Sequence, residues 1–129
     1  YNLQISENQA RVLVSALDAY SRIYIGQFDT AILDQFLFSQ NVNGSQMDAV
    51  RKLLDETKKV ITGFEGGASY GIHSTEVSDK ARVAYDLQQV IRHQLWKDTS
   101  PKDTWNVCSY PPHHTSTEGV SLAKIEKTC

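Results

Sequence analysis

Three long stretches of the chain carry apolar residues at the spacing of an α-helix, and this feature most limits the possible folds. In the first stretch, apolar residues recur every three or four positions between Leu13 and Phe28, and Ser6 is placed to cap the helix. Comparable spacing follows Ser45 and Ser78, each of which is a helix-capping residue type. We therefore predict three main helices, over about 6–25, 45–62 and 79–96, with a shorter helix over 29–38.

The C-terminal part of the chain has a different pattern. Residues 104–110 are rich in β-forming side chains and end at two prolines, and residues 120–125 begin with an alternation of apolar and small side chains. We therefore expect an α+β fold, one domain over residues 1–129, with a C-terminal two-stranded antiparallel β-hairpin. A hairpin of this kind leaves an exposed strand edge, so we also expect a homo-oligomer.

Composition excludes several classes of protein. With 129 residues, 40% of them hydrophobic, the chain can bury a core without a metal or a disulfide. Its formal net charge of −2 argues against binding to duplex nucleic acid, which needs a basic surface. No apolar run approaches the roughly 20 residues of a membrane span, and the first seven residues are too polar for a signal peptide. Cys108 and Cys129 fit two free thiols in a reducing cytoplasm, or a disulfide that sequence alone does not establish.

Two catalytic or metal-binding patterns are too weak to adopt. Cys108, His113 and His114 lie close in sequence, but their spacing matches no zinc motif and lacks a fourth ligand, so we predict no metal. The residues around Ser69 fit the letters Gly-x-Ser-x-Gly of a hydrolase, but a predicted helix rather than a strand precedes them. The glycines of this loop, from Gly63 to Gly71, could instead let its backbone approach a helix or a ligand.

The third predicted helix offers the most informative candidate site. At about 100° per residue, the side opposite its apolar stripe carries six larger polar and aromatic residues, which are Arg82, Tyr85, Gln89, Arg92, His93 and Trp96. Arginine and histidine can bind a phosphate or carboxylate, and aromatic rings, including nearby Tyr70, can stack on a base. The same residue types are also common where a helix packs against another segment or subunit, and that interpretation stays open.

Four segments of the chain resemble a known group of proteins. They are Ala16–Phe28, Ala68–His73, Ala81–His93, and the ending from Trp105–Val107 through Leu122–Glu126. Together they resemble small proteins of tailed phages and prophages, and within that group the anti-Thoeris sponge family. Members of that family bind a cyclic ADP-ribose isomer made by bacterial immune enzymes and do not cleave it, and some also hold cyclic oligonucleotides. They are built of helices with a small β element and assemble as dimers or larger oligomers.

The resemblance implies a phage sponge that sequesters a cyclic nucleotide in the cytoplasm of the host cell, with no catalytic residue and no cofactor. By residue type, we expect the ligand site to contain Ser69, Tyr70, His73, Arg82, Tyr85, Gln89, Arg92, His93 and Trp105. Two alternatives remain: a phage accessory protein that inhibits a host protein, and a small hydrolase that uses Ser69.

Overall fold

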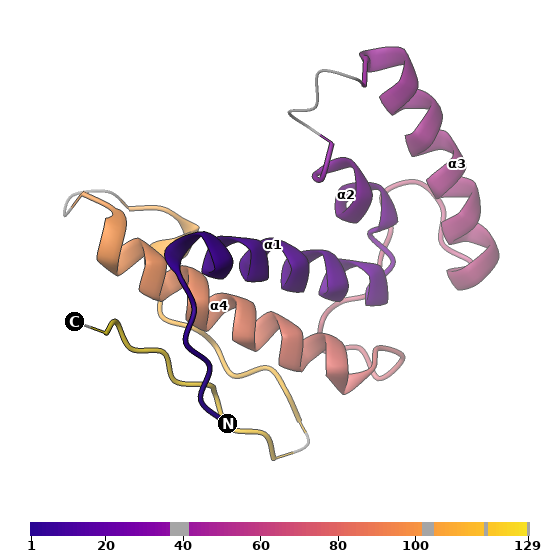
Figure 1. The fold of residues 1–129 in the computed structure, drawn as a ribbon. Coiled ribbons are helices and arrows are strands. Elements are labelled where there is room, and N and C mark those ends of the chain that lie inside the picture. Colours follow the sequence, from indigo (N-terminus) through magenta and orange to yellow (C-terminus); the bar gives the residue numbers. More distant parts are fainter. Residues whose placement is uncertain (37–41, 102–104, 118, 129) are drawn as a thin grey trace.

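The computed structural model describes residues 1–36, 42–101, 105–117 and 119–128, and within these residues the chain is all helical (Figure 1). The order of elements is α1 (Glu7–Tyr24), α2 (Phe28–Leu33), α3 (Gly44–Thr62), α4 (Asp79–Thr99) and a one-turn 3-10 helix, η1 (Val107–Ser109). The three long helices and the short one were therefore predicted in the right order. The prediction for 37–38 lies outside the described residues.

Side-chain caps fix where the long helices begin. Ser6 caps α1 as predicted, because its hydroxyl accepts a hydrogen bond from the Gln9 amide at 3.2 Å while the Gln9 side chain accepts one from the Ser6 amide at 2.8 Å. The cap of α3 lies two residues earlier than predicted, because Asn43 rather than Ser45 forms it. At the other end of α3, Gly63 has a φ of +78°, a left-handed conformation that glycine adopts readily.

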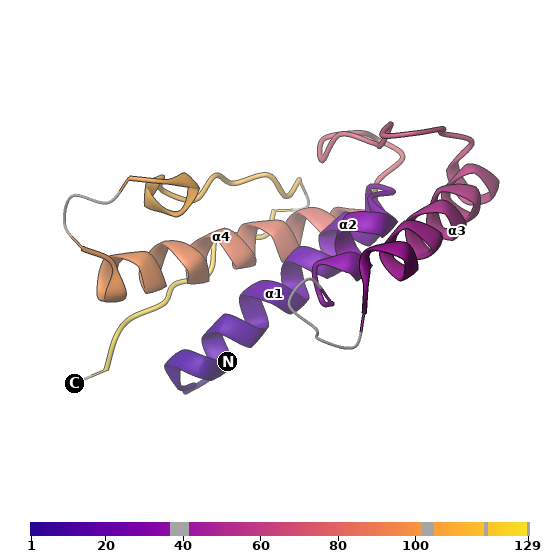
Figure 2. The same cartoon turned by 90° about the horizontal axis from the view of Figure 1, so that it is seen from above.

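Helices α1 and α4 run antiparallel and form the core of the molecule (Figures 1 and 2). The buried apolar residues of the two helices are mostly small: Ala10 on α1, and Ala81 and Ala84 on α4. Small side chains let two helix backbones approach closely, and Val90 and Ile91 add bulk toward the C-terminal half of α4. The longest helix of the chain therefore lies at its centre, with α1 on one side.

Helices α2 and α3 form an arm that projects from this core. Among the described helices, α3 contacts α2 alone, and α2 in turn contacts α1 (Figure 1). The C-terminal end of α3 is anchored by Lys58, which is buried and donates a hydrogen bond to the carbonyl of Gly66. A side chain at Gly26 would lie 3.6 Å from Thr62, so the turn after α1 sits close to the end of α3.

The predicted α+β fold and C-terminal hairpin are wrong, because none of the described residues forms a strand. Residues 107–109, expected in the first strand, form η1, and the described residues of 120–125 have no regular secondary structure. The physical reason is that polar side chains of α4 hold the segment that follows η1, as described below, in place of a second strand. The expected strand edge is absent from the described chain, so it no longer supports a homo-oligomer. No helix in the described part of the chain is long and apolar enough to cross a membrane.

We expect Ile91→Ala to lower the free energy of unfolding by about 2–4 kcal/mol, because Ile91 is 4% exposed in the core and truncation leaves a cavity. Val12→Ala on α1 is the control: its side chain is 67% exposed, and we expect a change below about 0.5 kcal/mol. Chemical denaturation followed by circular dichroism measures both. Equal losses in the two variants would contradict this core.

Candidate functional site

One side of α4, which we call the polar face, holds the chain that follows η1. It consists of five residues at alternating steps of three and four, which are Asp79, Arg82, Asp86, Gln89 and His93. This spacing places them along one line of the helix surface. Residues 108–117 run along that line in the direction opposite to α4, as Figure 2 shows above the helix.

The Asp86 carboxylate is buried and fully engaged. It accepts hydrogen bonds from the Thr115 amide at 2.9 Å and the Thr115 hydroxyl at 2.5 Å, and from the Ser116 amide at 3.0 Å and hydroxyl at 2.9 Å. Burial on its own raises the pKa of Asp86, but these hydrogen bonds outweigh it and hold the pKa below its ordinary value. Asp86 is therefore a charged anchor for the segment.

A second buried carboxylate, Asp79, works together with Arg82. Asp79 accepts bonds from the Thr117 amide at 2.8 Å and hydroxyl at 3.0 Å, and from Arg82 Nε at 2.8 Å. The Arg82 guanidinium also donates to the carbonyls of Ile72 at 3.1 Å and Ser74 at 3.3 Å. Arg82 therefore fastens the loop before α4 and the segment after η1 to the same turn of the helix, and it is 7% exposed.

The remaining two residues of the polar face bond to backbone groups. The Gln89 side chain donates to the His113 carbonyl at 3.3 Å and accepts from the His113 amide at 3.1 Å, as a neighbouring strand would. His93 Nδ1 donates to the Cys108 carbonyl at 2.9 Å, which makes Nδ1 the protonated ring nitrogen. Of the predicted ligand residues, Arg82, Gln89 and His93 thus make bonds within the chain.

Two further predicted ligand residues, Ser69 and Tyr70, lie against the turn between α1 and α2. The Ser69 hydroxyl accepts a hydrogen bond from Gln27 Nε2 at 3.3 Å, and the Tyr70 amide donates to the Ile25 carbonyl at 2.9 Å. The Tyr70 ring packs edge-on against Phe64, with centroids 4.8 Å apart. This part of the loop is therefore held against the turn that follows α1, and its role in ligand binding stays a prediction.

Tyr85, Arg92 and His73 have no hydrogen bond or ion pair among the described residues. Tyr85 and Arg92 are half-buried at one edge of the polar face, and His73 is exposed in the loop before α4. Since their steps along α4 are seven and four residues, Tyr85, Arg92 and Trp96 lie on one line of the helix.

Three rings, which we call the aromatic cluster, gather at the C-terminal end of α4. His93 stacks on Trp96 with centroids 5.7 Å apart and an angle of 18° between the rings. Trp105, the last of the predicted ligand residues, packs against Trp96 at 6.1 Å and is itself 75% exposed. An indole this exposed offers a broad flat face that a planar ligand group could cover.

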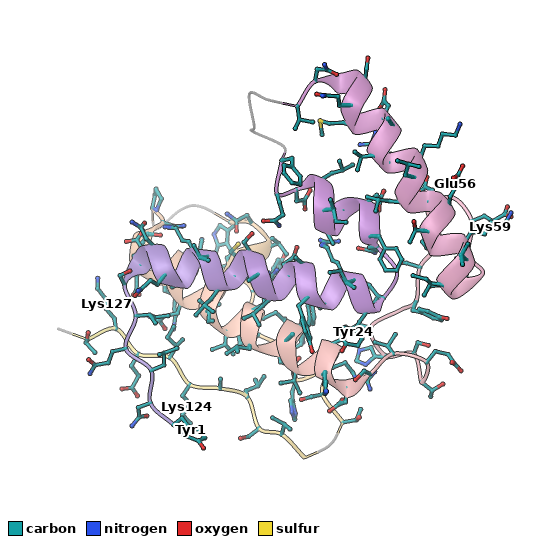
Figure 3. The ribbon with its side chains drawn as sticks, turned by 45° about the vertical axis from the view of Figure 1, so that its right-hand side comes forward. Tyr1, Tyr24, Glu56, Lys59, Lys124 and Lys127 are labelled. Carbon is teal, nitrogen blue, oxygen red and sulfur yellow. The ribbon has the colours of Figure 1, made fainter. Side chains whose placement is uncertain are left out.

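A groove of about 310 Å³ shares one residue, His93, with the aromatic cluster; Trp96 and Trp105 are not among its lining residues. One wall is α4, and the other is the C-terminal segment that returns along it (Figure 1). Its lining residues are Val90, His93, Gln94, Lys97, Pro112, Leu122, Ala123, Lys124, Ile125 and Glu126. Lys97 and Lys124 place a cation on each wall, and Glu126 adds one acid on the C-terminal segment, so the lining has a net charge of about +1 that favours an anionic group. Figure 3 shows Lys124 and Lys127 on the same segment, and only Lys124 lines the groove.

A second hollow, of about 400 Å³, lies over α3 and Gly66. Its lining side chains carry charges of both signs and include the ion pair of Lys59 with Glu65 at 2.6 Å. Figure 3 shows Glu56 and Lys59 on α3. Its lining has no ring for a base and carries four acidic against three basic side chains, so it is a weaker candidate for an anionic nucleotide.

The described residues also bear on the possible metal site and the possible hydrolase motif considered in the sequence. No group of three or more His, Cys, Asp or Glu side chains in the described part of the chain could hold a metal ion. The ring Nε2 of His114 pairs with the Val120 carbonyl, and Cys129 lies outside the described residues, which leaves its pairing with Cys108 untested. Ser69 follows α3 and a turn rather than a strand, which is not the setting of a nucleophile elbow.

Several residues of this site could not be identified from the sequence. Lys97, Lys124 and the Thr115–Thr117 segment become important through contacts between segments 25 to 40 residues apart, which no local pattern reveals. The one available signal is the pair Asp79 and Asp86, two acids seven residues apart on a helix.

No family model, curated protein or solved structure matches this chain.

We expect Asp86→Asn to lower the free energy of unfolding at pH 7 by about 2–3 kcal/mol, because an amide cannot accept all the charge-assisted bonds of the carboxylate. The folded pKa of Asp86 is below its unfolded value, so the unfolded chain binds more protons and the stabilisation holds above about pH 4 and fades below it. Chemical denaturation of the wild type and Asp86→Asn between pH 3 and pH 7 measures the difference in their free energies of unfolding. This difference should become smaller as the pH falls.

Asp98→Asn is the matched control on the same helix, because Asp98 is exposed and, among the described residues, its carboxylate accepts one hydrogen bond, from Gln94 at 3.0 Å. We expect it to change stability by less than about 0.5 kcal/mol. A gap for Asp86→Asn that stays constant with pH would argue against an ionised anchor.

Proposed function

We propose that this chain binds a small cyclic nucleotide of the cyclic ADP-ribose type without cleaving it, and so acts as a phage sponge for an immune signal in the host cytoplasm. The observation that carries the proposal is the aromatic cluster together with a groove that it meets at His93 and that has a lysine on each wall. The two parts match the two halves of a nucleotide, a flat base and anionic phosphates. The resemblance to the anti-Thoeris sponge family narrows the ligand to a cyclic one.

The base stacks on the exposed face of Trp105. The ring of Trp96 supports Trp105 from behind at 6.1 Å, and His93 fixes Trp96 in turn, so the face is positioned before the ligand arrives. His93 is itself held by its bond to the Cys108 carbonyl. A rigid aromatic platform reduces the entropy lost on binding.

The phosphates enter the groove between Lys97 and Lys124, where the ammonium groups make charge-assisted bonds to them. The groove volume of about 310 Å³ is at the lower end of the range for small-molecule sites. It therefore accommodates the phosphates and a ribose, while the base remains over the aromatic cluster. Arg92, half-buried on the other flank of His93, is a further cation for a ligand that extends that way.

We expect Trp105→Ala to weaken binding of cyclic ADP-ribose or its isomers by about 5- to 150-fold, the range that corresponds to the loss of one stacked base. Tyr110→Ala is the control, because Tyr110 is an aromatic residue of similar exposure, 66% against 75%, in the same segment. Isothermal titration calorimetry measures both affinities. Lys124→Gln should also weaken binding, and Lys127→Gln should not.

Heating the complex tests the absence of cleavage, since a sponge releases its ligand chemically intact. A cleaved product would favour the hydrolase alternative instead. No binding of any cyclic nucleotide by the wild-type protein would rule out the proposal.

A second candidate function is inhibition of a host protein, and exposed apolar side chains on α1 favour it. Val12, Tyr20 and Ile23 lie on one side of this helix and are 67%, 41% and 50% exposed. Capture of one host protein by the wild-type chain, lost in Val12→Asp, would support this function over nucleotide binding.

A further inference from the structure

The outer wall of the groove, residues 122–126, is held in place by few interactions. Leu122 and Ile125 are half-buried, and the other three residues of the wall are exposed. Within the part of the chain that the structure describes, no residue from 121 to 128 makes a hydrogen bond or an ion pair. The position of the wall therefore depends on two apolar side chains and on the bonds that hold the chain just before it.

The last point held before the wall is the backbone carbonyl of Val120. His114 pairs with this carbonyl through its ring Nε2. Since a carbonyl can only accept, Nε2 is the protonated ring nitrogen and donates the bond. The Ser116 hydroxyl also lies 3.4 Å from this carbonyl, but its single proton goes to the charged Asp86 carboxylate, which is closer, at 2.9 Å. His114 is therefore the main donor that holds Val120.

This bond joins the wall to the anchored segment. The two residues after His114 are buried and bonded to Asp86 on α4, so the backbone beside His114 is fixed. The chain after Val120 has no such anchor among the described residues. Gly119, between the two, has a φ of +72°, a conformation that glycine adopts readily. The bond from His114 to Val120 thus closes a short loop, and this loop sets where the wall begins.

We propose that His114 is a positioning residue of the groove. By holding the Val120 carbonyl, it keeps the wall against α4 and places Lys124 on the side opposite Lys97. Without this bond the wall detaches from α4 more often, because few other interactions retain it. The position of the wall is a property of the protein without ligand, and only the effect of His114 on affinity rests on the proposed function.

Limited trypsin digestion of the ligand-free protein tests the position of the wall. We expect His114→Leu to be cleaved after Lys124 about 3- to 10-fold faster than the wild type, because cleavage follows the population of the detached wall. Cleavage after Lys59 should not change, since α3 makes no contact with α4 in the described structure. His114 is exposed, so the variant should keep its core, which circular dichroism checks. Mass spectrometry identifies each product.

Two further variants separate the loss of the bond from other effects of the substitution. His114→Gln keeps a donor nitrogen close to the place of Nε2, so it should be cleaved at close to the wild-type rate. His113→Leu removes the neighbouring exposed ring, which makes no hydrogen bond to any described residue, and it should also leave the rate unchanged. Equal cleavage after Lys124 in the wild type and His114→Leu overturns the proposal, and so does an equal increase after Lys124 and Lys59.

The affinity for cyclic ADP-ribose gives a second result. We expect His114→Leu to weaken binding about 2- to 10-fold in the wild-type background and to have little effect in Lys124→Gln, because His114 acts through Lys124. Equal losses in the two backgrounds contradict the positioning role. If the wild type binds no cyclic nucleotide, the proposed function fails, and the digestion still decides whether His114 holds the wall.

Discussion

The fold depends on two carboxylates that are buried on α4 and must remain satisfied. Asp79 and Asp86 lie two turns apart, and each takes both the amide and the hydroxyl of a threonine, with Ser116 adding two more bonds to Asp86. Burying a carboxylate without such partners would cost far more than these bonds return. The segment after η1 therefore has one favourable position, along the polar face, and that position sets where the aromatic cluster and the groove can form.

This dependence explains which part of the fold could be predicted from the sequence. Helices are encoded locally: Ser6 and Gln9 lie three residues apart, and the apolar repeat of α1 follows directly, so the pattern and its cause are in one window. The hairpin was predicted from the β-forming residues Trp105, Val107 and Tyr110. The strand preference of these residue types reflects how well they pack on a half-buried, pleated surface, not an intrinsic preference of the backbone. Contacts with the rest of the fold therefore override it. Here the context is α4, whose polar-face side chains lie 15 to 38 residues away from their partners after α4.

The candidate site, like the fold, could be predicted from the sequence only in part. The residue types on the polar side of α4 indicated that this side meets something other than water. Two interpretations were open: that it binds a ligand, or that it packs against another segment or subunit. In the structure Arg82, Gln89 and His93 bond to the chain itself. A guanidinium has the same donors for a backbone carbonyl as for a phosphate, so residue type alone could not choose between them. Arg92 and Trp105 make no such bonds among the described residues. Lys97 and Lys124 are far apart in the sequence and line one groove only after the chain has folded.

The molecule thus buries a line of polar side chains along α4 beside its apolar core, and it exposes apolar side chains on its arm. The first half is explained within one chain, because each charge on the polar face meets its partners there. The second half is not, because Val60 and Ile61 gain nothing by facing water. An arm that holds these side chains away from its own core makes physical sense when something else covers them.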